Sequence, residues 1–242
     1  MSRIRILLAD DNQNMRTVYK RILETQDHIE IVGMAADGEE ALEQAMGLMP
    51  DVAILDIVMP KINGIEVARR IIDQKPDTGV VIISSFAHPA YVSAIMKDGA
   101  KSRGFILKSS LNDPSELIRV VEAVSNGQIV LDPIIVQRLF RVYNRQSSSP
   151  LTETEKNVLQ LMLEGRDTSF ITKTLGLRQE EMEANSATGY AKLGVIAQTW
   201  GDRISGAVRA LVNQWSEKER TLPESEVILD PFRLTSEDNG VV

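Results

Sequence analysis

The chain has 242 residues, a formal net charge of −7 and no cysteine. This length is typical of two domains, and the 43% apolar content is enough to bury two modest cores. The lack of cysteine excludes disulfides and thiolate metal sites and favours a reducing, cytoplasmic setting. The first apolar run, Ile6 to Ala9, is too short for a signal peptide or a membrane span, so we expect no membrane association.

Residues 1–127 alternate short apolar runs with amphipathic stretches. The apolar runs predict strands at Ile4–Ala9, Ile29–Met34, Val52–Leu55, Val80–Ile83 and Gly104–Leu107. The amphipathic stretches predict helices at Asn14–Thr25, Gly38–Leu48, Ile65–Gln74, Pro89–Lys97 and Ser115–Ser125. Consecutive apolar residues indicate strands that are buried on both faces. The pattern therefore predicts an α/β fold with a five-stranded doubly wound parallel sheet, which binds ligands at the carboxyl ends of its strands.

The pattern becomes helical after Gly127. We expect a linker at 128–149 with a helix from Pro133 to Asn144, and a flexible serine-rich segment at Gln146–Pro150. A small all-α domain at 150–216 follows, with helices at Glu153–Glu164, Ser169–Leu175, Gln179–Leu193 and Asp202–Ser216. Its first helix has a capping box, Thr152 with Glu155, and ends at Gly165. The acidic residues 217–242 are expected to be flexible.

Polar side chains follow four of the predicted strands. Asp10 and Asp11 come after the first strand, Asp56 after the third, Ser84 after the fourth and Lys108 after the fifth. Three neighbouring carboxylates repel one another unless a cation binds, and oxygen ligands without His or Cys favour a hard ion such as Mg²⁺. One carboxylate can then attack a phosphoryl group while the cation, the lysine and the hydroxyl bind the phosphoryl oxygens.

The segments LLADDNQNMR, AILDIVMPKINGIEVARRI, VVIISS and GFILKSS, in this order, resemble the flavodoxin-like receiver domain of two-component response regulators. The resemblance covers residues 1–127. It implies that Asp56 accepts a phosphoryl group from a histidine kinase and that Asp10 and Asp11 hold Mg²⁺, with Asp11 and Asp56 as direct ligands. It also implies that Ser84 and Lys108 contact the phosphoryl group.

The same resemblance implies that Phe105 is an aromatic switch residue, and it matches Pro60 and Gly64 to the loop after the phosphorylated aspartate. Phe105 as a plain core residue remains an alternative. A phosphatase of the haloacid dehalogenase type also uses aspartate and Mg²⁺, but its nucleophile lies on the first strand as D-x-D. Here the first two aspartates are adjacent, which favours the receiver interpretation.

Residues 150–195 are similar to the helix-turn-helix output domain of the NarL/LuxR type. The resemblance rests on apolar and turn positions in the opening helix, the scaffold helix and the close of the recognition helix, namely Leu151, Thr152, Glu155, Val158, Leu159, Gly165, Ile171, Leu175, Gly176, Leu177, Lys192, Leu193 and Gly194. It implies a DNA-reading helix over LRQEEMEANSATGYAKLGV.

This recognition helix is unusual because it carries acidic residues where the family commonly has DNA-facing cations. Its expected surface consists of Glu180, Glu181, Glu183, Asn185 and Lys192, and of these only Lys192 is basic. From residue 151 to 215 the chain has seven basic and eight acidic residues, whereas a groove-binding module usually has a basic face. The glutamates also complement the positive end of their own helix dipole, but this gives no affinity for DNA.

Two further features of the helical half are ambiguous. Gly189 lies inside the recognition helix, where glycine costs about 1 kcal/mol relative to alanine, and we expect it to interrupt the helix. In the last helix, Leu211 and Trp215 are candidates for a dimer contact, but they fit packing within their own domain equally well.

The sequence therefore predicts a cytoplasmic response regulator that is phosphorylated on Asp56 and uses Mg²⁺. We expect no enzymatic activity beyond its own phosphoryl transfer and dephosphorylation. The expected partners are a histidine kinase and a second copy of the chain after phosphorylation. Two output functions remain open: regulation of transcription by DNA binding, or a phosphorylation-dependent protein interaction or dimerisation in which the helix-turn-helix no longer binds DNA in the usual way.

Overall fold

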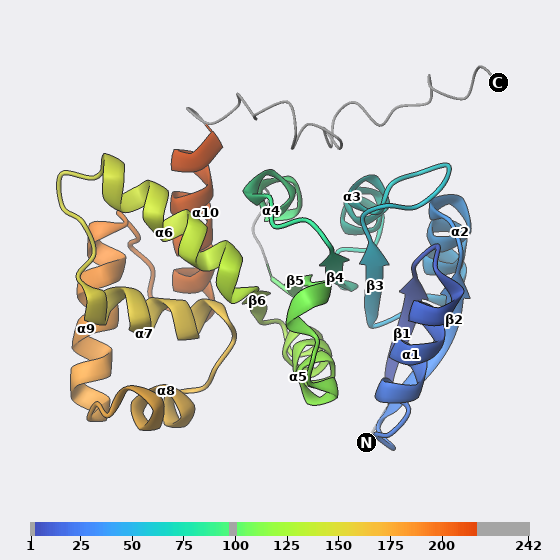
Figure 1. The fold of residues 1–242 in the computed structure, drawn as a ribbon, viewed down its shortest axis with the longest axis horizontal. Helices are drawn as coiled ribbons and strands as arrows, with labels where there is room; N and C mark the ends of the chain where they lie inside the picture. The colour runs from blue at the N-terminus through green and yellow to red at the C-terminus, as the bar shows by residue number, and fades with distance from the viewer. Residues whose placement is uncertain (1–2, 97–100, 217–242) are drawn as a thin grey trace.

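A computed structural model describes residues 3–96 and 101–216, without the side chains of residues 89, 90, 215 and 216. Its centre is a sheet of six parallel strands in the order β2-β1-β3-β4-β5-β6 (Figure 1). The strands are β1 (Ile4–Ala9), β2 (Ile29–Ala35), β3 (Val52–Asp56), β4 (Gly79–Ser84), β5 (Arg103–Leu107) and β6 (Ile129–Leu131). The predicted α/β doubly wound fold is confirmed.

Two layers of helices cover this sheet. They are α1 (Gln13–Leu23), α2 (Gly38–Leu48), α3 (Gly64–Gln74), α4 (Pro89–Met96) and α5 (Pro114–Ser125), with a short 3₁₀ turn η1 (Lys108–Ser110) before α5. Alternate residues of β1 enter opposite cores, because Leu7 packs with α2 and α3 while Ile6 and Leu8 pack with α1 and α5. The expected helices are confirmed to within two residues, except that Lys97, the predicted end of α4, lies outside the described residues.

The prediction of five strands was wrong, because β6 pairs in parallel with β5 as a sixth. This strand has only three residues, all buried, and lies beyond residue 127. Such a run is too short to show a strand period, and Pro133 starts a helix immediately afterwards. Asp132 fixes the junction: its carboxylate accepts the N–H of Leu107 on β5 (3.1 Å) and the N–H of Ile134 in the following helix (2.9 Å).

From residue 133 to residue 216 the chain forms five helices: α6 (Pro133–Gln146), α7 (Glu153–Leu163), α8 (Thr168–Leu175), α9 (Gln179–Lys192) and α10 (Trp200–Ser216). The predicted capping box of Thr152 and Glu155 is confirmed at the start of α7. Gly165 follows the end of α7 with φ +72°, a conformation that favours glycine. None of the helices within the described residues is long and apolar enough to cross a membrane. The predicted flexible tail, 217–242, lies outside the described residues.

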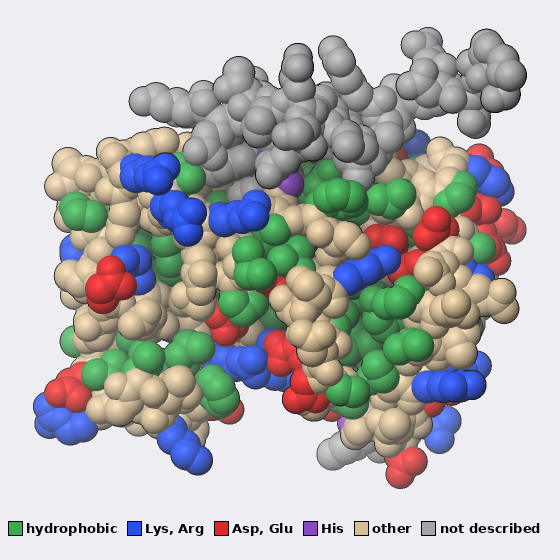
Figure 2. Space-filling model, in the orientation of Figure 1, with side chains coloured by type: hydrophobic (Ala, Val, Ile, Leu, Met, Phe, Trp, Pro, Cys, Tyr) green, Lys and Arg blue, Asp and Glu red, His purple; other side chains and the backbone are tan. Residues whose placement is uncertain are grey.

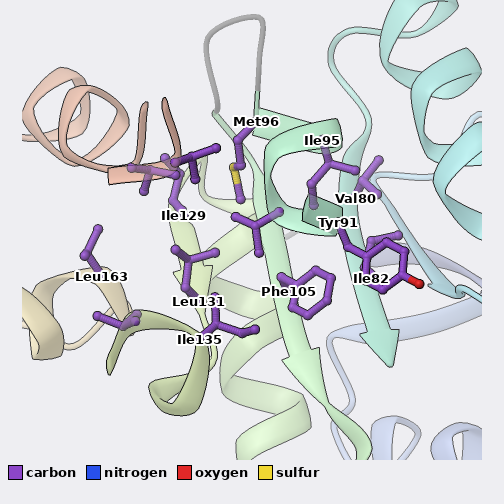
Figure 3. Close-up of a cluster of buried hydrophobic side chains, with 14 of the residues drawn as sticks. Val80, Ile82, Tyr91, Ile95, Met96, Phe105, Ile129, Leu131, Ile135 and Leu163 are labelled. Carbon is purple, nitrogen blue, oxygen red and sulfur yellow. The ribbon is translucent and has the colours of Figure 1, made fainter. Parts of the chain in front are cut away.

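The two halves of the chain share one hydrophobic core. Helix α10 packs against both α4 and α6, and its buried Leu211 belongs to the same cluster as Tyr91 and Ile95 of α4. Figure 3 shows Tyr91, Ile95 and Met96 of α4 beside the β5 and β6 strands, with Leu163 of α7 approaching from the other side. The helical half therefore lies directly on the receiver-like half, at the β6 end of the sheet (Figure 1).

A second contact between the halves is polar. Arg119 on α5 donates to the carbonyl of Glu164 (2.9 Å), at the turn between α7 and α8. Glu116 on the same helix pairs with Arg119 and with Arg166, which follows that turn. Burial acts to raise the pKa of Glu116, but its bonds to the two arginines outweigh burial and lower it. This carboxylate therefore holds both arginines in place at neutral pH.

Candidate functional site

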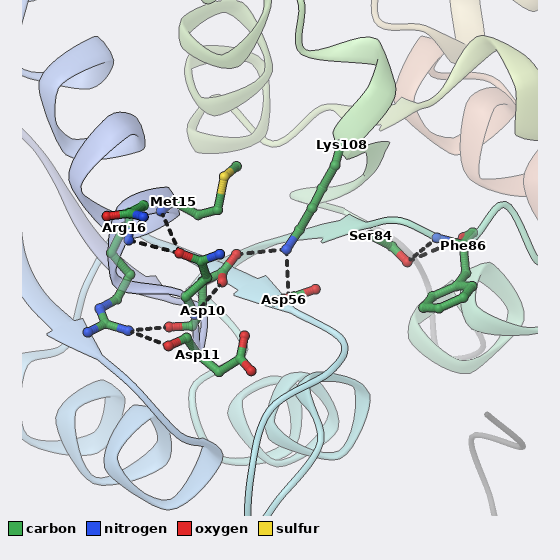
Figure 4. Close-up of polar contacts among 10 residues, drawn as sticks. Asp10, Asp11, Met15, Arg16, Asp56, Ser84, Phe86 and Lys108 are labelled. Carbon is green, nitrogen blue, oxygen red and sulfur yellow. Dashed lines mark hydrogen bonds and ion pairs between the residues drawn. The ribbon is translucent and has the colours of Figure 1, made fainter. Parts of the chain in front are cut away.

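The predicted site residues meet at the carboxyl edge of the sheet, at the ends of four neighbouring strands. Asp10 follows β1, Asp56 ends β3, Ser84 ends β4 and Lys108 follows β5, and these four strands are neighbours in the order β1-β3-β4-β5. Figure 4 shows Asp10, Asp56 and Lys108 pointing toward one another, with Ser84 to one side near Phe86. The sheet topology alone brings together groups that are up to 98 residues apart in sequence.

Lys108 bridges the two buried carboxylates. Its Nζ lies 2.7 Å from Oδ2 of Asp56 and 2.9 Å from Oδ2 of Asp10. Asp10 and Asp56 are only 3% and 6% exposed. Burial raises the pKa of Asp56 despite its bond to Lys108. Burial acts to lower the pKa of Lys108, but the two carboxylates prevail and raise it, so the bridging group is an ammonium ion.

An acidic cluster beside this lysine has the composition of a magnesium site. Carboxylate oxygens of Asp10, Asp11 and Asp56 lie within 4.8 Å of one another. The single positive charge of Lys108 leaves this group with two uncompensated negative charges. A divalent cation would balance them, and ligands that are all oxygen favour Mg²⁺ over a softer metal. The residues present therefore fit the ion that the sequence predicts.

Arg16 and Asn12 hold the acidic loop, although the sequence alone predicts no role for either residue. Nη1 of Arg16, on α1, donates to the carbonyls of Asp10 (2.6 Å) and Asp11 (3.2 Å). The N–H of Asn12 donates to Oδ1 of Asp10 (2.9 Å), while its side chain caps α1. Asp10 therefore has one carboxylate oxygen bound to the backbone and the other to Lys108. An arginine one turn into a helix gives no sequence signal for this role.

The loop after Asp56 explains the glycine at position 64. The N–H of Gly64 donates to the carbonyl of Ile57 (2.9 Å), and a Cβ at this position would lie only 1.8 Å from the carbonyl oxygen of Asp56. A side chain here would displace the backbone that carries Asp56. Pro60, in the same loop, accepts the N–H of Gly38 from the start of α2 (3.2 Å).

Ser84, at the end of β4, and Phe105, on β5, both have contacts in this structure other than the acidic cluster. The buried hydroxyl of Ser84 accepts the N–H of Phe86 (2.9 Å) and donates to the carbonyl of the same residue (3.3 Å). Phe105 is fully buried in the core, near Tyr91 and Ile82 (Figure 3). The structure thus shows Phe105 as a packing residue, and its role as a switch stays a prediction.

Lys192, the one basic residue within α9, is turned inward. Nζ of Lys192 lies 2.7 Å from Oε2 of Glu155 on α7 and 3.2 Å from the carbonyl of Pro150. Glu155 is 4% exposed, and its carboxylate also accepts the N–H of Thr152. Burial acts to raise the pKa of Glu155, but Lys192 and Thr152 outweigh it and lower that pKa. Lys192 therefore neutralises a buried carboxylate that also caps α7.

The outward surface of α9 is acidic. Glu180 and Glu183 are exposed, and Glu181 forms an ion pair with Arg178 (3.0 Å) just before the helix. The side chain of Asn185 donates to the carbonyl of Glu181 (2.7 Å) within the same helix. The exposed surface of α9 therefore has little positive charge that could bind DNA phosphates.

The expectation that Gly189 interrupts the helix was wrong, since α9 continues from Gln179 to Lys192. Gly189 is buried, and a Cβ there would lie 2.7 Å from Cδ1 of Leu159 on α7. The glycine therefore allows α7 and α9 to pack closely. A cost in helix propensity is offset by this contact, which the sequence alone does not reveal.

The two candidates for a dimer contact lie on α10. Leu211 is fully buried between α10 and the rest of the chain, so it is not exposed to a second copy in this structure. The side chain of Trp215 lies outside the described residues. A dimer role for either residue stays a prediction.

An acidic cluster with a bridging lysine, at the carboxyl edge of a parallel sheet, is typical of a receiver domain. A family model described as the response regulator receiver domain matches residues 6–122. The chain is 31% identical to the transcriptional regulatory protein DegU of Brevibacillus brevis, across 88% of this chain and 95% of that protein. It is 32% identical to the transcriptional regulatory protein MctR of Rhizobium johnstonii, across 80% of this chain and 88% of that protein. The chain therefore belongs to the two-component response regulators.

Among solved structures, the RcsB response regulator of Salmonella typhimurium has the same fold. That structure has a TM-score of 0.53 and 23% sequence identity to this chain, and the match covers 89% of this chain and 99% of RcsB. At this identity the likeness concerns the fold alone, but it extends across both halves. The all-helical C-terminal region thus matches the region that follows the receiver in RcsB.

Proposed function

We propose that Asp56 is the phosphorylated residue of this response regulator and that a histidine kinase supplies the phosphoryl group. A carboxylate oxygen of Asp56 attacks phosphorus, the bond to the kinase imidazole breaks, and that imidazole leaves after it takes up a proton. Mg²⁺ held by Asp10, Asp11 and Asp56 would supply positive charge against the developing negative charge on the phosphoryl oxygens. In this proposal residues 1–127 are the receiver domain, 128–149 the linker and 150–216 the output domain.

The observation that carries the proposal is the position of Lys108, 2.7 Å from Oδ2 of Asp56. An ammonium group at this distance is placed to bind an oxygen of a phosphoryl group attached to Asp56. Ser84 lies at the end of β4, between the strands that carry Asp56 and Lys108, so its hydroxyl could contact another oxygen of the phosphoryl group. For that contact the Ser84 hydroxyl would have to break its bonds to the backbone of Phe86. The loop that joins β4 to α4 would then move.

Labelling by a small acyl phosphate, measured by intact mass, tests this assignment. The wild-type chain should gain one phosphoryl group in the presence of Mg²⁺ and very little after chelation of the metal. Asp56→Asn should abolish the gain, while Asp73→Asn, an exposed aspartate on α3, should leave it unchanged. Persistent labelling of Asp56→Asn would assign the phosphorylation to another aspartate.

For the output we propose regulation of transcription by a cytoplasmic protein. The support is the helical fold that follows the receiver and the naming of DegU and MctR as transcriptional regulatory proteins. A homodimer of the phosphorylated form that uses Leu211 would require α10 to leave α4, because this residue is buried between the halves. Phosphorylation at the edge of the sheet and release of α10 would then be coupled events.

A second output is favoured by a specific observation, the inward ion pair of Lys192 with Glu155. With this lysine occupied and Glu180 and Glu183 exposed, α9 suits a basic protein surface better than a DNA groove. Replacing Glu180, Glu181 and Glu183 with lysine separates the two outputs. If α9 faces DNA, the triple variant should bind mixed duplex DNA more tightly and with a steeper salt dependence. No change in either quantity would show that α9 does not face DNA.

A further inference from the structure

Helix α6 carries a basic stripe on its exposed face. Arg138, Arg141 and Arg145 are all exposed, and their spacing places them along one side of the helix. The opposite side is buried in the shared core. Figure 2 shows Lys and Arg side chains gathered over α6. We call these three residues the arginine stripe; at 1.5 Å per residue it extends about 10 Å along the helix.

The positive charge of the stripe is not balanced locally. Helix α6 contains no Asp or Glu. Arg138 donates one N–H to the carbonyl of Ala87. Within residues 3–96 and 101–216, no ion pair joins any of the three guanidinium groups to a carboxylate. Three arginines this close together repel one another and favour an anionic partner.

The chain itself contains an anionic segment directly after α10. Residues 217–242 have seven acidic and three basic residues, which gives a net charge of −4. They follow Ser216, the last residue of α10, and α10 packs against α6. The eight residues 217–224 can extend over at most about 28 Å, which exceeds the roughly 10 Å length of the stripe. A tethered segment of this kind has an effective concentration of about 1 mM or more.

We propose that residues 217–242 bind to the arginine stripe of the same molecule through their carboxylates. The tether favours this occupant over duplex DNA, which would have to displace a segment that is always present at high local concentration. The consequence is an electrostatic cover over the main exposed basic surface of the linker helix. The inference does not depend on which residue is phosphorylated.

The absence of cysteine in the chain permits a direct test. Ser225→Cys in the 242-residue chain creates one thiol, within the acidic segment, that can carry a nitroxide label. At low salt, backbone amide signals of residues 137–146 should lose at least about half of their intensity. In about 1 M NaCl, where the Debye length is about 3 Å, the intensity should recover.

Charge variants identify the contact. In the labelled chain, Arg141→Glu with Arg145→Glu should abolish the broadening, and Arg141→Lys with Arg145→Lys should retain it. Arg21→Glu, at an exposed arginine on α1, is the matched control and should have no effect. Separately, changing Glu224 and Glu226 to Gln and Asp230 to Asn should weaken the broadening at low salt.

Four outcomes would overturn the proposal. Signals of α6 that stay sharp at low salt would show that the segment does not bind there. Broadening that survives the Glu variants or 1 M NaCl would show that the contact is not with the arginines. Broadening of an unlabelled, isotope-enriched chain mixed with the nitroxide-labelled chain would make a second copy the occupant. Loss of the broadening on addition of one equivalent of mixed duplex at about 0.15 M salt would make DNA the preferred partner.

Discussion

Replacing Lys192 with methionine separates a structural role for this lysine from a role in DNA binding. Methionine keeps most of the aliphatic stem but removes the ammonium group that lies 2.7 Å from Glu155. If the lysine serves the fold, the free energy of unfolding should fall and DNA binding should change little. If the lysine serves as a phosphate anchor, DNA binding should weaken and the free energy of unfolding should change little.

The structure gives the expected size of the loss. A hydrogen bond to a charged group contributes about 1.5–3 kcal/mol. The side chain of Lys192 is 21% exposed, so water replaces part of the interaction, and Glu155 keeps its bond to the N–H of Thr152. We therefore expect Lys192→Met to lower the free energy of unfolding by about 2 kcal/mol at pH 7.

The loss should depend on pH. In the wild type the pKa of Glu155 is lowered on folding, so its contribution to stability is present above the unfolded pKa, about 4.3, and is lost as the pH falls through the folded value. In the variant, burial acts on Glu155 without Lys192 and should raise its pKa. The difference between the two proteins should therefore begin to shrink as the pH falls through the raised pKa of the variant, and should keep shrinking until the pH passes the lowered pKa of the wild type.

Urea unfolding followed by tryptophan fluorescence measures this difference, because both tryptophans of the chain lie on α10. Lys173→Met, at an exposed lysine on α8, is the matched control and should change stability little. The DNA salt slope is the second readout, since loss of one phosphate anchor reduces it by about 0.9. Unchanged stability together with a slope reduced by about 0.9 would refute the structural role.

Two substitutions of glycine test the close contacts in each half. Gly189→Ala should destabilise the chain by about 1–3 kcal/mol in urea, because its Cβ would lie 2.7 Å from Leu159, whereas helix propensity alone predicts a gain of about 1 kcal/mol. A gain would show that α7 and α9 are not packed this closely. Gly64→Ala should slow acyl phosphate labelling at fixed Mg²⁺, because its Cβ would displace the backbone of Asp56. An unchanged labelling rate would mean that this loop tolerates a side chain.

The receiver site was largely predictable because its geometry follows from strand order. Runs of consecutive apolar residues indicate buried parallel strands, and their carboxyl ends must meet at one edge. Strand order alone therefore predicts that Asp10, Asp56 and Lys108 converge, and no knowledge of side-chain positions is needed. The contribution of Arg16 was not predictable, because it binds backbone carbonyls, and such contacts leave no mark on residue spacing.

The helical half was predictable in its elements but not in its contacts. Capping residues and periodicity located α7 through α10, because these signals are local. The inward ion pair of Lys192 joins residues 37 apart in sequence, and a lysine on a helix surface gives no sign of its partner. The strand β6 was missed because three residues cannot establish a period, and its pairing with β5 is set by the fold.

In the mechanism proposed for this chain, phosphorylation of Asp56 controls an output that regulates transcription. The most direct test is the binding of mixed duplex DNA to the phosphorylated and unphosphorylated chain across a salt series. We expect salt-sensitive binding that strengthens on phosphorylation of the wild type and does not strengthen for Asp56→Asn. The absence of binding at low salt by a folded, phosphorylated chain would contradict this mechanism and would assign the helical domain to protein contacts.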